Sequence, residues 1–158
     1  MTNYERQVWW VNQGSSYRLS SEAGFLWTPI VDGKGVERSG WKIMTSVKQN
    51  DVILHSCKGS IRAVSRALSN AYNAPRPLLL SYDTHNPDQG HCIDAEYFIF
   101  SDAIPVSMVA IGILQLAIDK GPLDKNGQPK QSYMHKFSWA GLQIIRQAVS
   151  QPWPTWIE

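Results

Sequence analysis

A chain of 158 residues, 43% of them hydrophobic and 18% charged, can bury one core but is too short for two ordinary domains, so we expect a single domain over 1–158 with its core in about 7–149. A net charge of +2 excludes a protein that grips long stretches of nucleic-acid backbone. Glu5, Arg6 and Gln7 interrupt any signal-peptide core and no apolar run approaches the roughly 18 residues that cross a membrane, so we expect a cytoplasmic protein without membrane contact.

Cysteine and histidine positions show neither a metal site nor a disulfide framework. The two cysteines, Cys57 and Cys92, form no CxxC pair, and the four histidines have no HxxxH spacing. His91 and Cys92 are neighbours, so in a strand they cannot easily share a tetrahedral metal. We therefore expect two buried or half-buried thiols in a reducing compartment, and neither a metal nor any other cofactor.

The first third of the chain predicts short strands separated by turns. QVWWVNQ at 7–13 is aromatic and β-branched and ends at Gly-Ser-Ser, which indicates a buried strand that stops in a loop. FLWTP at 25–29 is a second short apolar segment that its proline ends, and the glycine-rich stretch at 32–35 is typical of a turn. Apolar residues at helical spacing within 41–47 predict a helix of one to two turns.

The middle of the chain predicts a hairpin followed by irregular structure and another strand. Two β-like runs flank a Lys-Gly turn, which favours a hairpin. The predicted elements of this part are strands at 51–57 and 59–68, a turn-rich segment at 70–77, a short strand at 78–82, a loop at 83–90 and a strand at 91–100.

The last third predicts two helices and a strand. Residues 107–118 begin with a serine at a capping position and have near-helical apolar spacing, 131–138 are strand-like, and 139–149 read as a helix capped by Ser138. Five or six short strands with three helices predict an α+β domain, in which a small curled, mostly β sheet or barrel is flanked by about three helices.

Three segments in fixed order resemble the YTH/EVE branch of the PUA-like fold. They are WWVNQGSSY at 9–17, GFLWTP at 24–29 and DVILHSCKGSIRAVSRAL at 51–68, followed by DKNGQPKQSYMHKFS at 124–138, and together they span roughly 7–138. The resemblance implies a reader domain in which a polar loop after the first strand contacts a bound base. It also implies that the Gly-apolar-Trp-Thr segment supplies one wall of an aromatic cage.

The first two segments look closest to the EVE-like domains at the N-termini of bacterial modification-dependent restriction endonucleases. Such domains recognise methylated or hydroxymethylated cytosine in DNA, and a separate nuclease domain cuts. The chain has no HNH-like set, no PD-(D/E)xK pattern and no P-loop. The resemblance therefore implies a non-catalytic domain that binds modified double-stranded DNA and works with a fused or associated nuclease domain.

The resemblance and the residue chemistry together define a candidate pocket for a flipped base. Trp27 is the expected aromatic wall, with Tyr82 or Trp41 as the second wall and Tyr72 as a further candidate, because stacking on an aromatic ring stabilises any base. Because aromatic rings stack with any base, discrimination between bases requires the amide and hydroxyl groups of the polar loop. The expected polar residues are Asn12, Gln13, Ser15, Ser16 and Tyr17, with Thr28 or Ser56 to contact a hydroxymethyl group.

Basic side chains on the predicted hairpin and the loop after it could contact phosphates on either side of the base. They are Lys58, Arg62, Arg66 and Arg76. A plainer interpretation of all these candidates stays open. The cations can be ordinary solvated residues on a hairpin, and Trp27 can be a core tryptophan. Asn12 and Gln13 can form a strand-end turn that hydrogen-bonds its own backbone.

Three other functions are compatible with the sequence. The same fold can read modified RNA, for example N6-methyladenine. A hydrolase or nuclease could use His55 or His91 with Asp83 or Asp94 as an acid-base pair, although no nucleophile elbow and no carboxylate cluster is present. The last alternative is a protein-interaction module without a nucleic-acid ligand.

Overall fold

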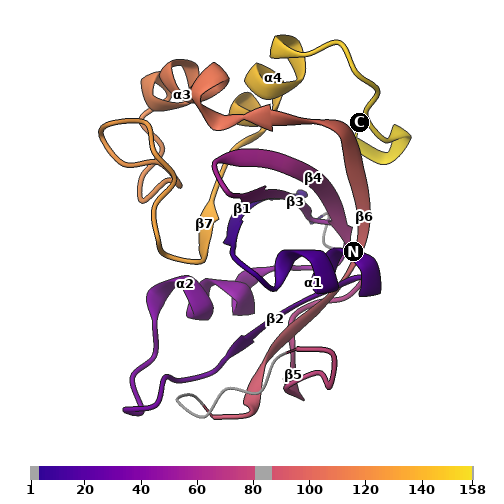
Figure 1. Ribbon diagram of the computed structural model, residues 1–158, viewed down its shortest axis with the longest axis vertical. Coiled ribbons are helices and arrows are strands. Elements are labelled where there is room, and N and C mark those ends of the chain that lie inside the picture. The colour runs from indigo at the N-terminus through magenta and orange to yellow at the C-terminus, as the bar shows by residue number, and fades with distance from the viewer. Residues whose placement is uncertain (1–3, 81–86, 158) are drawn as a thin grey trace.

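A computed structural model of the chain, which describes residues 4–80 and 87–157, is built around one curled mixed sheet (Figure 1). The strand order is β2-β6-β4-β3-β1-β7, with β5 paired to β6, and β1 is parallel to β3 while the other pairs are antiparallel. The strands are β1 Val8–Gln13, β2 Phe25–Pro29, β3 Val52–Cys57, β4 Ser60–Ala67, β5 Tyr72–Pro75, β6 Gln89–Pro105 and β7 Met134–Lys136.

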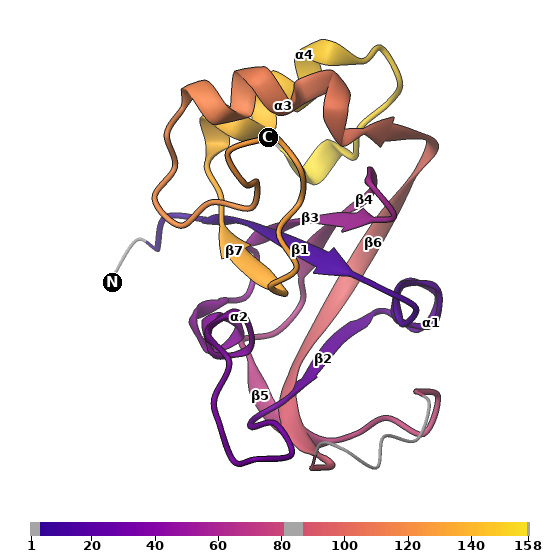
Figure 2. The ribbon, with the colours of Figure 1, turned by 60° about the vertical axis from the view of Figure 1, so that its left-hand side comes forward.

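Short helices surround the sheet. Figure 2 shows α3 and α4 together on one side, α1 between β1 and β2, and α2 below β7. The α-helices are α1 Tyr17–Ala23, α2 Ser39–Lys42, α3 Val106–Gln115 and α4 Trp139–Ala148, and the 3-10 helices are η1 Ile43–Ser46 and η2 Thr155–Ile157. The predicted α+β class and curled sheet are confirmed, and no helix in the two described ranges is long and apolar enough to cross a membrane.

Several predicted elements have different boundaries in the structure. The turn-rich segment contains β5, residues 78–80 form a turn rather than a strand, and the rest of that predicted strand lies outside the described residues. The last strand is only three residues long. Helix α3 begins at Val106 instead of at a serine cap, because Pro105 with φ −58° joins the strand directly to the helix.

Helix α1 was not predicted, because its sequence YRLSSEA lacks an apolar stripe. It ends at Gly24, whose φ of +82° lies in the left-handed region, and a Cβ there would lie 3.0 Å from the carbonyl oxygen of Ala95. Glycine is therefore required where α1 turns into β2. By contrast, α4 begins as predicted, with the Ser138 hydroxyl accepting a hydrogen bond from the Gly141 amide at 3.0 Å.

Both faces of β1 are buried, because side chains alternate along a strand and hydrophobic clusters lie on either side. Trp9 packs with Met44 and Ile53 on what we call the inner face, inside the curl of the sheet. Trp10 packs on the outer face, where its ring centroid is 5.3 Å from that of Phe137, beside α3 and α4. The tryptophan-rich N-terminus therefore anchors two cores at once.

The carboxylate of Asp51, fully buried, ties the N-terminal segment to the start of β3. It accepts hydrogen bonds from the Trp9 indole at 2.9 Å, the Tyr4 hydroxyl at 2.8 Å, and the backbone amides of Gln7 at 3.0 Å and Lys48 at 2.9 Å. Burial, followed by the hydrogen bond to Asp51, raises the pKa of Tyr4 to about 12. Four donors around one carboxylate form a strong structural link.

We expect Asp51→Asn to lower the free energy of unfolding by about 2 to 4 kcal/mol, because an amide NH2 would face donors that need an acceptor. Urea denaturation followed by tryptophan fluorescence measures this loss. The matched control is Asp119→Asn at an exposed position, which we expect to change stability by less than about 0.5 kcal/mol. Equal stability of the two variants would contradict the role assigned to Asp51.

Candidate functional site

Consecutive polar residues at the end of β1 face opposite sides of the sheet. Gln13 continues the inner face of Trp9, and its side-chain oxygen lies 2.7 Å from Nδ1 of His55. Asn12 continues the outer face of Trp10 and accepts a hydrogen bond from the Trp10 indole at 2.7 Å. The two amides of the predicted recognition loop therefore have different surroundings and different roles.

Gln13 belongs to a buried chain of polar groups inside the curl. Nε2 of His55 lies 2.6 Å from the Ser65 hydroxyl, and the His55 ring packs on Tyr97 with 4.3 Å between ring centroids. Burial lowers the pKa of His55 to about 3, so its imidazole is neutral at physiological pH. A histidine that cannot be protonated near neutral pH is unsuited to general acid-base catalysis.

Three half-buried tyrosines lie near one another beside this polar chain: Tyr97 packs on His55, and Tyr17 and Tyr133 are neighbours of Tyr97. We call these three residues the tyrosine cluster. The Tyr97 hydroxyl donates to the carbonyl oxygen of Phe25 at 2.9 Å. Burial raises the pKa of Tyr97 well above its usual value, and the neighbouring phenols of Tyr133 and Tyr17 raise it further. The amide nitrogen of Gln13 and the hydroxyl of Tyr17 are buried and have no hydrogen-bond partner among the described residues.

Asn12 forms hydrogen bonds with the segment that contains Tyr133, one member of the tyrosine cluster. Its backbone amide donates to the carbonyl oxygen of Tyr133 at 2.7 Å. Its side-chain nitrogen donates to the carbonyl oxygens of Lys130 at 2.9 Å and Ser132 at 3.3 Å. These bonds fix the segment that leads into β7 against the end of β1. Asn12 thus positions Tyr133 and the chain beside it.

A groove runs between α2 and the segment that leads into β7, which lie side by side (Figure 1). One cavity of about 570 Å³ is lined by Arg38, Ser39, Gly40, Trp41, Gln131, Ser132 and Tyr133. A second, of about 510 Å³, shares three of these residues and adds Lys42, Ile43, Thr45, Ser46, Lys120, Lys130, Met134 and His135. We call the two together the α2 groove; it carries four cationic side chains and two aromatic rings.

Trp27 lies on the opposite side of β2 from Leu26 and Thr28, which face the inner core. The indole is only 6% exposed; its nitrogen donates to the carbonyl oxygen of Ala74 at 2.9 Å, and the Arg76 guanidinium carbon lies 4.5 Å from its ring centroid. The expectation was an open hollow beside this ring, next to the 12–16 loop. In the described residues the ring is instead packed beneath Arg76 and lines neither cavity of the α2 groove.

The remaining predicted pocket residues are spread over the fold. Ser15 and Ser16 lie in the turn before α1, Thr28 is buried on the inner face, and Ser56 pairs with Asn12 on β3. Tyr72 lies on β5, where its hydroxyl donates to the Asp94 carboxylate at 2.7 Å. Tyr82 lies outside the described residues.

The predicted phosphate contacts mostly have partners within the chain. Arg62 donates to the carbonyl oxygen of Cys57 at 2.8 Å, Arg66 forms an ion pair with Glu96 at 2.9 Å, and Arg76 lies 3.4 Å from Asp88. Lys58 is exposed at the hairpin turn with φ +53°. The cations that line the α2 groove are Arg38, Lys42, Lys120 and Lys130, none of which the sequence motifs indicated. Two of them also have ion pairs: Arg38 with Asp32 at 3.5 Å and Lys42 with Glu37 at 3.7 Å.

The residues proposed for an acid-base pair do not assemble one in the described parts of the chain. His91 and Asp94 are three residues apart in β6, so their side chains project from opposite faces. Asp83 lies outside the described residues. No group of three metal-ligating side chains occurs within the residues that the structure describes.

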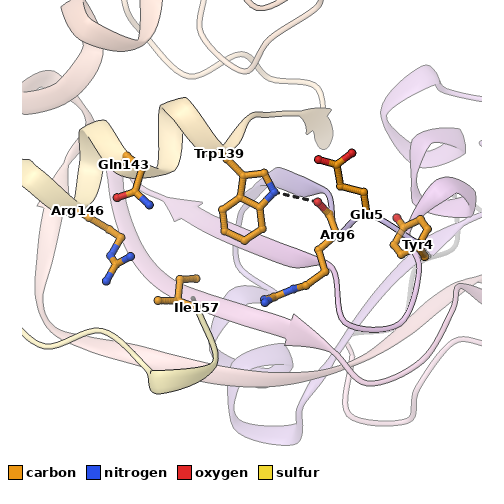
Figure 3. A pocket seen from close by; sticks show the side chains of 7 residues that line it. All are labelled: Tyr4, Glu5, Arg6, Trp139, Gln143, Arg146 and Ile157. Atoms are coloured by element: carbon orange, nitrogen blue, oxygen red, sulfur yellow. Dashed lines mark hydrogen bonds between the residues drawn. The ribbon is translucent and has the colours of Figure 1, made fainter.

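A cavity of about 740 Å³ lies between the N-terminal segment and α4, where Figure 3 shows the Trp139 indole next to the backbone of Arg6. The indole nitrogen donates to the Arg6 carbonyl oxygen at 2.9 Å, and the Arg6 guanidinium carbon lies 5.4 Å from the ring centroid. This cavity is on the α4 side of the sheet, away from Gln13, and contains none of the predicted site residues.

No protein-family model matches the chain, and no curated protein matches it in sequence. The YTH domain of Pho92, solved in complex with m6A, superposes with a TM-score of 0.57 at 11% identity, over 96% of this chain and 92% of its own. The chain has a YTH-like fold. At this identity the similarity shows the fold of the YTH-like domain and nothing about its ligand.

Two further structures share the YTH-like fold. The YTH domain of Zygosaccharomyces rouxii MRB1, in complex with N6-methyladenosine RNA, has a TM-score of 0.50 at 11% identity, over 90% of this chain and 86% of its own. Protein PSPTO5229 from Pseudomonas syringae has a TM-score of 0.55 at 16% identity, over 90% of this chain and 99% of its own. The predicted YTH-like architecture is confirmed.

Trp27→Ala should lower the free energy of unfolding by about 3 to 5 kcal/mol, because it removes a buried indole and its hydrogen bond. Urea denaturation measures this loss. Trp41→Ala is the matched control: its ring is half-buried in the groove, so we expect a loss below about 2 kcal/mol. A Trp27→Ala variant as stable as the parent chain would contradict the packing described here.

Proposed function

We propose that the chain is a reader domain that binds one modified nucleobase of a nucleic acid between the tyrosine cluster and Gln13. The observation that carries this proposal is a group of three half-buried tyrosines in which Tyr97, the neighbour of the other two, also lies beside a buried amide. The nitrogen of that amide has no partner of good geometry among the described residues. Aromatic faces stabilise a base by stacking, and an unpaired amide can read its edge. Two structures with the same fold, solved with N6-methyladenosine or m6A, support a ligand of this kind.

The ligand we propose is DNA that carries 5-methylcytosine or 5-hydroxymethylcytosine. A base inside a duplex must be extruded, at a cost of a few kcal/mol, before three rings can surround it. Stacking at roughly 1 to 3 kcal/mol per base offsets most of this cost. One methyl group contributes only about 0.8 kcal/mol by buried area, so preference for a methylated base requires a close fit.

RNA containing N6-methyladenine is the second candidate, and the two YTH domains solved with that modified nucleoside favour it. Within residues 4–80 and 87–157 the inner face offers no acid-base pair, and we propose that the chain binds without catalysis. A fused or associated nuclease domain would then supply any strand cleavage, as in the restriction enzymes that the sequence resembles.

The α2 groove is the proposed path of the phosphate backbone. It begins at Tyr133 and continues past Lys130 to Lys120 and Lys42. The Arg38 guanidinium carbon lies 5.3 Å from the Trp41 ring centroid, a cation-π contact that leaves planar surfaces for stacking. A groove with four cations suits the short footprint that a net charge of +2 allows.

Tyr17→Ala and Tyr133→Ala should each weaken binding of a modified oligonucleotide about 5- to 100-fold, because each removes a stacking surface. Fluorescence titration at fixed salt, with matched modified and unmodified DNA and RNA, measures both affinity and polymer preference, and thermal melting checks the fold. The comparison variant is Tyr72→Ala on β5. If Tyr72→Ala abolished binding while the cluster variants retained it, the base site would lie near Trp27 instead.

Replacing Lys42, Lys120 and Lys130 together by alanine should reduce the dependence of log affinity on log salt by about 2 to 3 for DNA, since each phosphate contact contributes about 0.9. The control is the triple alanine variant at Lys34, Lys48 and Lys136, three exposed lysines outside the groove. Both triple variants lose the same total charge. Equal salt slopes for the two triple variants would contradict the proposed path.

A further inference from the structure

The buried polar chain contains one group that the fold does not use. Gln13 is only 5% exposed, and its side-chain nitrogen carries two hydrogens. The Tyr97 phenol lies beside it and can accept at most one of these hydrogens. By hydrogen-bond geometry the nitrogen has no partner among the described residues, so at least one hydrogen is left over. An unpaired buried donor is costly, so a ligand atom that accepts from this nitrogen beside the tyrosine cluster would remove that cost.

The structure places the side-chain oxygen of Gln13 toward His55 and its side-chain nitrogen away from that ring. The side-chain oxygen can only accept, so the hydrogen on His55 must be on Nδ1, 2.7 Å away. A neutral imidazole has only one such hydrogen, so its Nε2 accepts from the Ser65 hydroxyl at 2.6 Å. This arrangement satisfies all four atoms and keeps the amide nitrogen on the side of Tyr97. The reversed amide would require the hydrogen of His55 to be on Nε2.

We propose that Gln13 determines specificity in the base site by donating a hydrogen bond to an unprotonated ring nitrogen, so that the site selects the amino bases cytosine and adenine over the keto bases. His55 and Ser65 are positioning residues that hold the amide in this orientation. This inference rests on the proposed function, because it assigns the class of base to the same site.

The selection follows from the hydrogen-bonding edges of the bases. Cytosine N3 and adenine N1 lie beside the exocyclic amine and accept a hydrogen bond. Thymine, uracil, guanine and hypoxanthine carry an N–H at the equivalent position, so two donors would face each other. Leaving a buried donor unpaired costs about 1 to 3 kcal/mol, which corresponds to roughly 5- to 150-fold in affinity. The three modified bases considered above, 5-methylcytosine, 5-hydroxymethylcytosine and N6-methyladenine, belong to the amino class.

A matched pair of ligands tests the inference: 5-methylcytosine and thymine at one position of the same single-stranded oligonucleotide. They differ only at the amino or keto group and at protonation of N3. We expect the parent chain to prefer 5-methylcytosine by at least about 5-fold, and Gln13→Met to reduce this preference to within about 2-fold. Gln13→Glu, which presents an acceptor, should shift the preference toward thymine. Adenine against hypoxanthine in RNA gives the equivalent pair.

The positioning roles have a spectroscopic readout. Long-range nitrogen-15 NMR of the His55 ring should show the tautomer protonated on Nδ1, and Ser65→Ala should disturb that tautomer and lower the 5-methylcytosine to thymine ratio. Ser60→Ala, on the same strand but outside the polar chain, is the control that leaves both unchanged. A His55 ring protonated on Nε2 in the parent chain would overturn the inference.

Failure of the inference and failure of the proposed function give different results. If the parent chain prefers a modified base over its unmodified form while Gln13→Met keeps the amino-base preference in full, the inference is wrong and the reader function stands. If the parent chain binds modified and unmodified oligonucleotides equally, both are wrong. Thermal melting of Gln13→Met confirms that the variant is folded, and Gln13→Glu supplies an independent measurement.

Discussion

Burial of both faces of β1 is the constraint on which the candidate site depends. Parallel pairing with β3 places Gln13 beside Cys57 in register, and alternation sends Gln13 inward and Asn12 outward. A slip of one residue would exchange the two amides, breaking the contact of Gln13 with His55 and the bonds by which Asn12 holds the segment next to β7. The tryptophans at positions 9 and 10 fix the register because each fills a different core.

Elements with a strong local pattern could be predicted from the sequence, and elements made by long-range contacts could not. The strands at 7–13 and 51–57 and the helix after Ser138 follow from apolar runs and a capping serine. Strand β5 was missed because Tyr72–Pro75 has turn-forming residues and is held extended only by pairing with β6. The carboxylate of Asp51 gave no local signal either, since its donors come from positions 4 to 9 and 48.

The same distinction applies to the site. Gln13 and Tyr17 were predicted as candidate site residues because a polar loop after a buried strand is a recognisable pattern, whereas His55 and Tyr97 lie close to Gln13 only through strand register. The resemblance emphasised Trp27, but a motif does not say which side of β2 the indole faces, and here it faces the β5 segment. Lysines of the α2 groove come from separate segments, so no local cluster of positive charge marked them.

The chemistry of the candidate site suits recognition because the tyrosine cluster and the His55 ring beside it keep one protonation state near neutral pH. Burial lowers the pKa of His55 to about 3 and raises that of Tyr97 and Tyr133, so none of these three exchanges a proton near pH 7. Catalytic acids and bases need a pKa close to the working pH. Groups that do not titrate there instead present a constant pattern of donors and acceptors, and selection between bases that differ by one hydrogen requires such a pattern.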